Sequence, residues 1–139
     1  MKLRKSAVVA AGVIALAAPA ALPAHAVPAV PAAPATCLLT AFGHAMPYVC
    51  GSRTLSPDWD HDGQRDEVFA VSPPNNYIYR ISAGSNGPVR VGNGRAATMR
   101  NWEIRPSTQR RVYAVTATNH VYYSYLGTGG WSDWYPYAP

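Results

Sequence analysis

The sequence predicts an all-β protein built from two copies of one antiparallel strand repeat. Each copy has two strand-like runs separated by an Asn-containing turn, and the copies are 44 residues apart. The matching positions are Val68–Val71, Asn75 and Tyr77–Tyr79 in the first copy, and Val112–Val115, Asn119 and Val121–Tyr123 in the second. Residues in these runs alternate with the period of two that strands require. Glycine clusters at 84–87, 92–94 and 127–130 predict turns between strands.

A strand-rich repeat of about 40–45 residues has the spacing of a β-propeller blade. We therefore expect two propeller-like blade repeats, at residues 55–97 and 98–139. Two blades cannot close a ring that needs about four to eight, and their open faces and edges favour association with further copies. We expect ring closure by homo-oligomerisation, with a small monomeric β-sandwich as the alternative.

Residues 1–26 have the three parts of a secretory signal peptide. A cationic start is followed by an apolar run from Ala7 to Leu16 and by the small-residue cleavage site Ala24–Ala26. We predict cleavage near Ala26 and a secreted, extracellular protein. No other stretch approaches the roughly 20 apolar residues of a membrane span, so no membrane span is expected.

Residues 27–36 are rich in Pro and Ala, which is typical of an extended linker without a buried face. Cys37 and Cys50 are the only cysteines, and an exported chain with an even number usually pairs them. We expect residues 37–54 to form a disulfide-closed loop. In the chain-entropy model a bridge that closes about 15 residues stabilises a protein by roughly 3 kcal/mol. Free thiols or metal ligands are the alternative.

Composition and motifs argue against nucleic-acid binding and catalysis. Without the signal peptide the chain keeps nine Arg, no Lys and seven acidic residues, so its formal charge falls from +5 to +2. Export and this small charge favour scattered surface Arg over a nucleic-acid interface. No hydrolase or zinc motif is present, and we predict that the protein is not an enzyme. A glycosidase pair drawn from Glu67, Glu103 and Asp133 is the alternative.

An acidic loop precedes the first copy of the repeat. Calcium needs six to eight oxygens, and oxygen donors at alternate positions converge in a turning segment in which Gly63 permits the bend. The predicted Ca²⁺ ligands are Asp58, Asp60, Asp62, Gln64 and Asp66, with Gln64 at a position that normally contributes a backbone carbonyl. The bidentate Glu of an EF-hand would fall at Phe69, inside a strand, which argues against an EF-hand. A solvated acidic turn without metal is the alternative.

The pattern Asp-x-Asp-x-Asp-Gly-x-x-Asp, running directly into Glu67–Val71, resembles the FG-GAP/VCBS repeat. In that propeller-blade family a calcium loop opens the blade, so the resemblance implies one structural calcium site in this chain. The second copy departs from the family. Arg105–Arg110 replaces the acidic residues there, and we expect no second calcium site.

The second copy also resembles the bacterial fucose-binding and tectonin-type propeller lectins. The resemblance rests on Arg111–Val115, the Tyr-rich strand after it and Gly129–Trp134. Some of those lectins build a six-bladed ring from three two-repeat chains. In them an Arg near the head of the first strand and a Trp from the Gly-Gly-Trp segment engage the sugar, which implies Arg111 and Trp131. The fucose lectins place a Glu on the next strand, where residues 121–125 have no acid.

Aromatic faces can cover the apolar face of a pyranose, while polar side chains fix its hydroxyls. The chain has nine Tyr and four Trp, most of which we expect to pack between strands. The residues predicted to bind ligand are Arg111, Tyr113, Trp131 and Tyr135. We predict a lectin-like module with a structural calcium site that binds extracellular glycans. The alternative is a calcium-braced interaction or adhesion module that binds a cell-surface protein.

Overall fold

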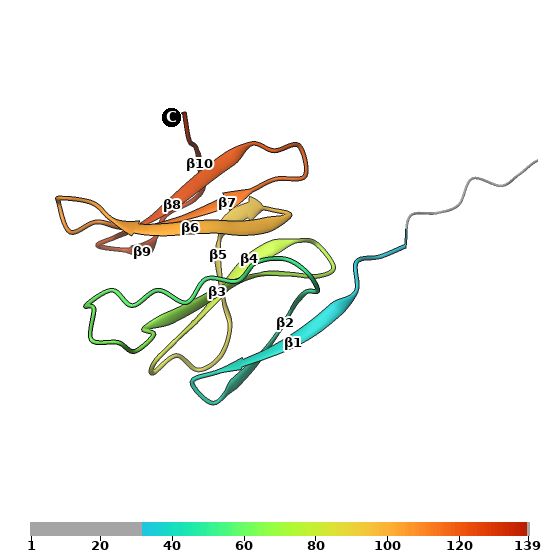
Figure 1. Cartoon of the computed structure of the whole chain (residues 1–139), viewed down its shortest axis with the longest axis horizontal. Helices are drawn as coiled ribbons and strands as arrows, with labels where there is room; N and C mark the ends of the chain where they lie inside the picture. Colours follow the sequence, from blue (N-terminus) through green and yellow to red (C-terminus); the bar gives the residue numbers. More distant parts are fainter. Residues whose placement is uncertain (1–31, 139) are drawn as a thin grey trace, which may run out of the picture. The chain divides into compact units, whose positions relative to one another are not determined.

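The computed structural model describes residues 32–138. The predicted signal peptide and residues 27–31 of the predicted linker lie outside the described residues. Within residues 32–138 all regular elements are β-strands, and every strand pair is antiparallel (Figure 1). The predicted all-β, antiparallel fold is therefore confirmed.

The described strands form three sheets (Figure 1). The hairpin layer consists of β1 (Thr36–Ala41) and β2 (His44–Val49). The middle sheet has the order β3 (Glu67–Ser72), β4 (Tyr77–Ser82), β5 (Val89–Arg95). The C-terminal sheet has the order β6 (Thr98–Ile104), β7 (Arg110–Val115), β8 (Val121–Gly127), β10 (Tyr135–Pro136), and the short β9 (Gly130–Trp131) also pairs with β8.

The middle sheet is covered on both faces. Phe69 and Val71 of β3 belong to a core shared with the C-terminal sheet, where they meet Val112 of β7. Val68 and Ala70 belong to a second core beneath the hairpin layer. Every residue of β3 is therefore buried, which explains why its apolar run is continuous rather than strictly alternating.

The two copies of the sequence repeat occupy matching strands, with one difference in register. Four residues, 73–76, connect the paired residues Ser72 and Tyr77, whereas five residues, 116–120, connect Val115 and Val121. The structural counterpart of Asn119 in the turn is consequently Asn76 rather than Asn75, since both Asn76 and Asn119 adopt positive φ. The sequence repeat therefore matches β3 to β7 face for face, but not β4 to β8.

The segment predicted as a disulfide-closed loop is a β-hairpin. The bridge between Cys37 and Cys50 is present as predicted, and β1 pairs with β2 along its whole length. Met46 is buried against the middle sheet, whereas Leu38 on the opposite face is 67% exposed. This alternation gives the segment an apolar face to bury, which the loop prediction did not take into account.

Gly92–Gly94 was predicted as a turn but lies inside β5. A side chain at Gly92 would meet Asp133, and one at Gly94 would overlap the indole of Trp134. The two glycines therefore make room for the segment before β10 to pack on β5. Their function is close packing between the two repeats rather than chain reversal.

The middle and C-terminal sheets share one core, and no closed ring of sheets forms within residues 32–138. This arrangement is compatible with the small β-sandwich alternative, and ring closure with further copies stays a prediction. In the part of the chain that the structure describes, no helix is long and apolar enough to cross a membrane.

Candidate metal and ligand sites

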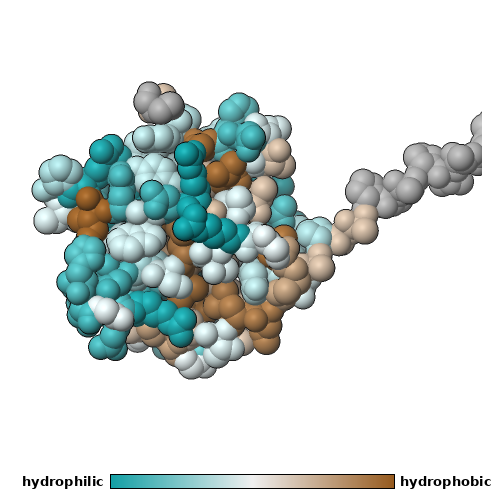
Figure 2. All heavy atoms as spheres, in the orientation of Figure 1, coloured by the Kyte–Doolittle hydropathy of each residue, from teal (hydrophilic) through white to brown (hydrophobic). Residues whose placement is uncertain are grey.

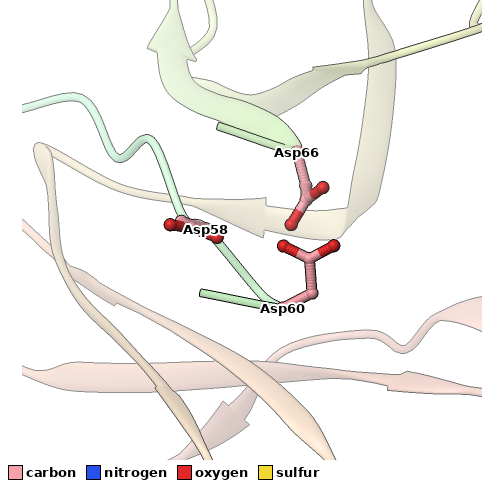
Figure 3. A group of neighbouring side chains, drawn as sticks. All are labelled: Asp58, Asp60 and Asp66. Carbon is pink, nitrogen blue, oxygen red and sulfur yellow. The ribbon is translucent and has the colours of Figure 1, made fainter. Parts of the chain in front are cut away.

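Three of the five predicted metal ligands converge in the acidic loop. Asp58, Asp60 and Asp66 each offer a carboxylate oxygen, and these oxygens all lie within 4.8 Å of one another (Figure 3). Asp58 and Asp60 precede the turn at Gly63, and Asp66 lies just before β3. In Figure 3 the carboxylates of Asp60 and Asp66 point toward one another.

This cluster fits a calcium ion in size and chemistry. Oxygens on opposite sides of Ca²⁺ are about 5 Å apart, because each lies about 2.3–2.6 Å from the ion. The loop backbone holds the donors in place, since the N–H of Gly63 donates to Asp58 Oδ2 at 2.9 Å. Asp62 instead accepts the N–H of Gln64 at 2.7 Å. The carboxylate of Asp62 is not part of the three-carboxylate cluster.

The acidic loop is joined to the core through Trp59. The backbone N–H of Trp59 donates to Asp66 Oδ2 at 2.6 Å, and its indole N–H donates to Glu67 Oε2 at 3.1 Å. Glu67 is itself buried and forms an ion pair with Arg80 at 2.8 Å. A metal ion that held Asp66 in place would therefore also restrain Trp59, which belongs to the core. The position of Glu67 directly after the last Asp is the sequence signal for this link.

Trp131, a predicted ligand residue, lies between the middle and C-terminal sheets. Its ring packs edge-on against Phe69 with 5.1 Å between centroids, and it also approaches Trp59 at 6.1 Å. Its indole N–H points to Glu67 Oε1 at 3.5 Å. Trp131 is thus half-buried against the shared core, apart from the other three predicted ligand residues.

Those three residues share the outer face of the C-terminal sheet. We define the tyrosine face as Arg111, Tyr113, Tyr123, Tyr125, Tyr135 and Tyr137, which are linked by ring contacts of 4.7–6.1 Å. Tyr135 is 43% exposed, but Tyr113 is only 5% exposed. Burial and a hydrogen bond to Glu103 raise the pKa of Tyr113. Tyr113 therefore supports this face from below rather than offering its ring to a ligand.

A cavity of about 370 Å³ opens on the other side of the C-terminal sheet, between it and the middle sheet. Its apolar wall is formed by Ile78, Ala96 and Ala114, and its aromatic side chains are Tyr122 and Trp134. Its polar side chains are Asn93, Arg95, Thr116 and Asp133. Polar and aromatic groups from both repeats therefore converge on one half-open cavity.

The acidic and aromatic groups of this cavity are held by backbone hydrogen bonds. Asp133 Oδ1 accepts the N–H groups of Asn93 and Trp134, each at 2.9 Å, and these bonds lower the pKa of the Asp133 carboxyl. The indole N–H of Trp134 donates to the carbonyl of Val91 at 2.8 Å. Both side chains are thus oriented before any ligand arrives.

Arg95 is the cationic group of the cavity. It donates to the hydroxyl of Tyr77 at 3.2 Å, and its guanidinium lies 4.9 Å from the centre of that ring. This hydrogen bond lowers the pKa of Tyr77. Neither Arg95 nor Asp133 forms an ion pair within residues 32–138, so both charges remain available to a ligand.

Sequence reasoning did not identify this cavity. Asn93 lies in the segment predicted as a turn, and the prediction that most Tyr and Trp residues pack between strands gave Trp134 no role in binding. The available signal was the pair of glycines that flank Asn93, because Gly within a strand marks the close approach of another group.

No protein-family model, characterised protein or solved structure matches this chain. Its function is therefore inferred from the geometry of these sites.

Proposed function

We propose that this protein is a secreted, lectin-like carbohydrate-binding module with a structural calcium site. The observation that carries the proposal is the cavity between the two repeats, whose volume of about 370 Å³ suits one sugar ring. The Cys37–Cys50 bridge supports secretion, because disulfides persist in oxidising compartments outside the cytosol.

The side chains of the cavity match the chemistry of a pyranose. Tyr122 and Trp134 offer aromatic surface for the C–H face of the ring. The hydroxyl edge meets an acceptor in Asp133, a donor in Arg95 and an amide in Asn93, which can do both. The cavity is lined by one carboxylate, Asp133, and one guanidinium, Arg95, so their charges balance when a neutral sugar binds. A sugar acid would bring a second anion beside Asp133.

Calcium has a structural role in this proposal. Asp58, Asp60 and Asp66 would hold the ion, which would offset the mutual repulsion of the three carboxylates. None of these residues lines the cavity. We therefore expect the ion to support sugar binding through the stability of the fold, and not by bridging to sugar hydroxyls.

Glycan-array binding of the mature protein tests the proposal. We expect a signal for glycans with neutral terminal sugars, and a loss of roughly threefold to tenfold in affinity for Tyr122→Leu, the range for a lost aromatic contact worth about 0.5–1.5 kcal/mol. Tyr125→Leu is the matched control, because it makes the same change on the opposite face of β8. An array on which the wild type binds no saccharide would contradict the proposal.

The second candidate is a calcium-braced module that binds a cell-surface protein, and the exposed tyrosine face favours it. A silent glycan array, together with cell binding that is lost after protease treatment of the cells, would support this candidate. Binding lost after glycosidase treatment would support the sugar instead.

A further inference from the structure

A second cavity adjoins the one between the repeats. We define the turn groove as this space of about 390 Å³, which is lined by residues 74–76, 95–97 and 116–118. Three residues line both the turn groove and the cavity between the repeats: Arg95, Ala96 and Thr116. The two spaces are therefore contiguous.

The internal repeat builds the turn groove. Residues 73–76 connect β3 to β4 in the first repeat, and residues 116–120 connect β7 to β8 in the second. The link from β5 to β6 is bonded to both repeats, because the N–H of Ala96 donates to the carbonyl of Asn76 at 3.0 Å and the N–H of Ala97 donates to the last residue of β7 at 2.8 Å. In Figure 1 these three connections lie at the right-hand end of the sheets. Each repeat therefore supplies one wall of the groove.

Polar groups come from opposite walls of the turn groove. Asn75 belongs to the first turn and Thr118 to the second, and both residues are exposed. The hydroxyl of Thr118 lies 3.1 Å from the hydroxyl of Thr116 and 3.1 Å from Nδ1 of His120, so contacts within its own turn hold it in place. An amide and a hydroxyl can each donate and accept hydrogen bonds. Both walls can therefore bond to sugar hydroxyls.

The rest of the lining is small and mostly uncharged. Pro74, Ala97 and Ala117 add apolar surface, and Arg95 is the one charged side chain among the residues that line the groove. Figure 2 shows hydrophobic residues gathered elsewhere, at the lower right over the hairpin layer. The turn groove thus combines a few hydrogen-bonding groups with small apolar patches, which suits a sugar ring better than an apolar segment of protein.

Arg95 stands where the two spaces meet. It forms no ion pair within residues 32–138, and its guanidinium has more donors than its bond to the hydroxyl of Tyr77 uses. It can therefore donate to hydroxyls on both sides of the junction. The cavity between the repeats has the volume of one sugar ring, so a longer glycan must leave it. The turn groove is an exit whose walls can bind the next residue of that glycan.

We propose that the turn groove is a second sugar subsite, so that the protein binds two adjoining residues of a neutral glycan. This inference rests on the proposed function, because one residue occupies the cavity between the repeats. The other residue lies in the turn groove between Asn75 and Thr118, and Arg95 donates to both residues at the junction. Recognition of a disaccharide unit therefore needs the turns of both repeats.

Isothermal titration calorimetry of the mature protein with matched neutral sugars tests the second subsite. The probes are glucose with maltose and cellobiose, galactose with galactobiose, and N-acetylglucosamine with chitobiose. At least one disaccharide should bind roughly tenfold more tightly than its monosaccharide, because it adds about one hydrogen bond with its contacts.

A combined replacement in the turn groove isolates this gain. Asn75→Ala together with Thr118→Val should remove the gain and leave the monosaccharide affinity unchanged, because neither residue lines the cavity between the repeats. Asn86→Ala together with Thr128→Val is the matched control, since these exposed residues line neither space. The control should keep the gain. Circular dichroism shows whether each protein is folded.

The outcomes separate this inference from the proposed function. If no sugar of either length binds, the proposed function fails and the second subsite fails with it. If monosaccharides bind and no disaccharide binds more tightly, the cavity is a sugar site and the turn groove is not. A gain that survives the combined replacement arises at another surface. A folded variant that also loses monosaccharide binding would show that the turn groove is not a separate subsite. Each of these last three results overturns the inference alone.

Discussion

At the scale of single residues, the cavity depends on hydrogen bonds and packing contacts between residues of the two repeats. Asp133 accepts the backbone N–H of Asn93, and Trp134 reaches the carbonyl of Val91. Gly94 leaves the space that the indole of Trp134 fills. These contacts close one end of the interface between the repeats, so the residues that form the site also stabilise the fold.

Asp133→Asn tests this double role through its pH dependence. The folded pKa of Asp133 is depressed by two backbone N–H donors, so its charge stabilises the fold above the ordinary pKa and stops doing so as the pH falls through the folded pKa. We expect the variant to lose roughly 0.5 kcal/mol at pH 7, because solvent screens so exposed a group. The loss should shrink below about pH 4. Denaturant unfolding of both proteins at several pH values measures it, and a loss independent of pH would contradict this account.

The sequence does not show which face of a strand each side chain occupies. Tyr122 and Tyr123 are adjacent, yet Tyr122 lines the cavity and Tyr123 belongs to the tyrosine face. The 44-residue repeat aligns Tyr122 with Ile78 in sequence. The turn before β8 is one residue longer than the turn before β4, so these two aligned residues point to opposite faces of their repeats. One extra turn residue moves every later side chain of a strand to the other face, and no local pattern shows that shift.

At the scale of elements, the acidic loop and the hairpin layer are separate braces on the middle sheet. The loop leads into β3 and is fixed to the core by Trp59, which is 4% exposed. The hairpin covers the other face of β3 through Met46 and Ala41. Both braces act on the most buried strand in the described chain.

Calcium should raise the unfolding temperature of the mature protein. An ion that binds only the folded state adds about 2.7 kcal/mol at a hundred times its dissociation constant. We expect Asp60→Asn to remove this increment, because Asp60 belongs to the three-carboxylate cluster. Asp133→Asn, a carboxylate change outside the loop, should keep it. Thermal unfolding with calcium or with chelator measures both, and an Asp60→Asn protein that keeps the full increment would exclude Asp60 as a ligand.

Elements with a local cause could be predicted from the sequence. The Cys37–Cys50 bridge and the convergence of Asp58, Asp60 and Asp66 follow from short spacings. The inclusion of Gly92–Gly94 in β5 does not, because it depends on Asp133 and Trp134 about 40 residues away. Local turn chemistry favoured a turn, and the packing of the two repeats overrode it.

At the scale of the whole molecule, two repeats and a hairpin make three layers within residues 32–138. The sequence predicts the all-β class and the matching strands β3 and β7, since strand alternation is strong there. It does not predict that the hairpin covers the first repeat, because that segment lies outside the repeat pattern.

The most direct measurement is a two-dimensional NMR titration of the mature protein with neutral monosaccharides, following backbone amide and Trp indole signals. The cavity predicts that one or more sugars shift the indole signal of Trp134 and the amides of Asn93, Gly94 and Tyr122. The amides of Tyr135 and Tyr137 on the tyrosine face should stay unchanged. A panel that moves no signal, or that moves only the tyrosine face, would contradict a sugar site between the repeats.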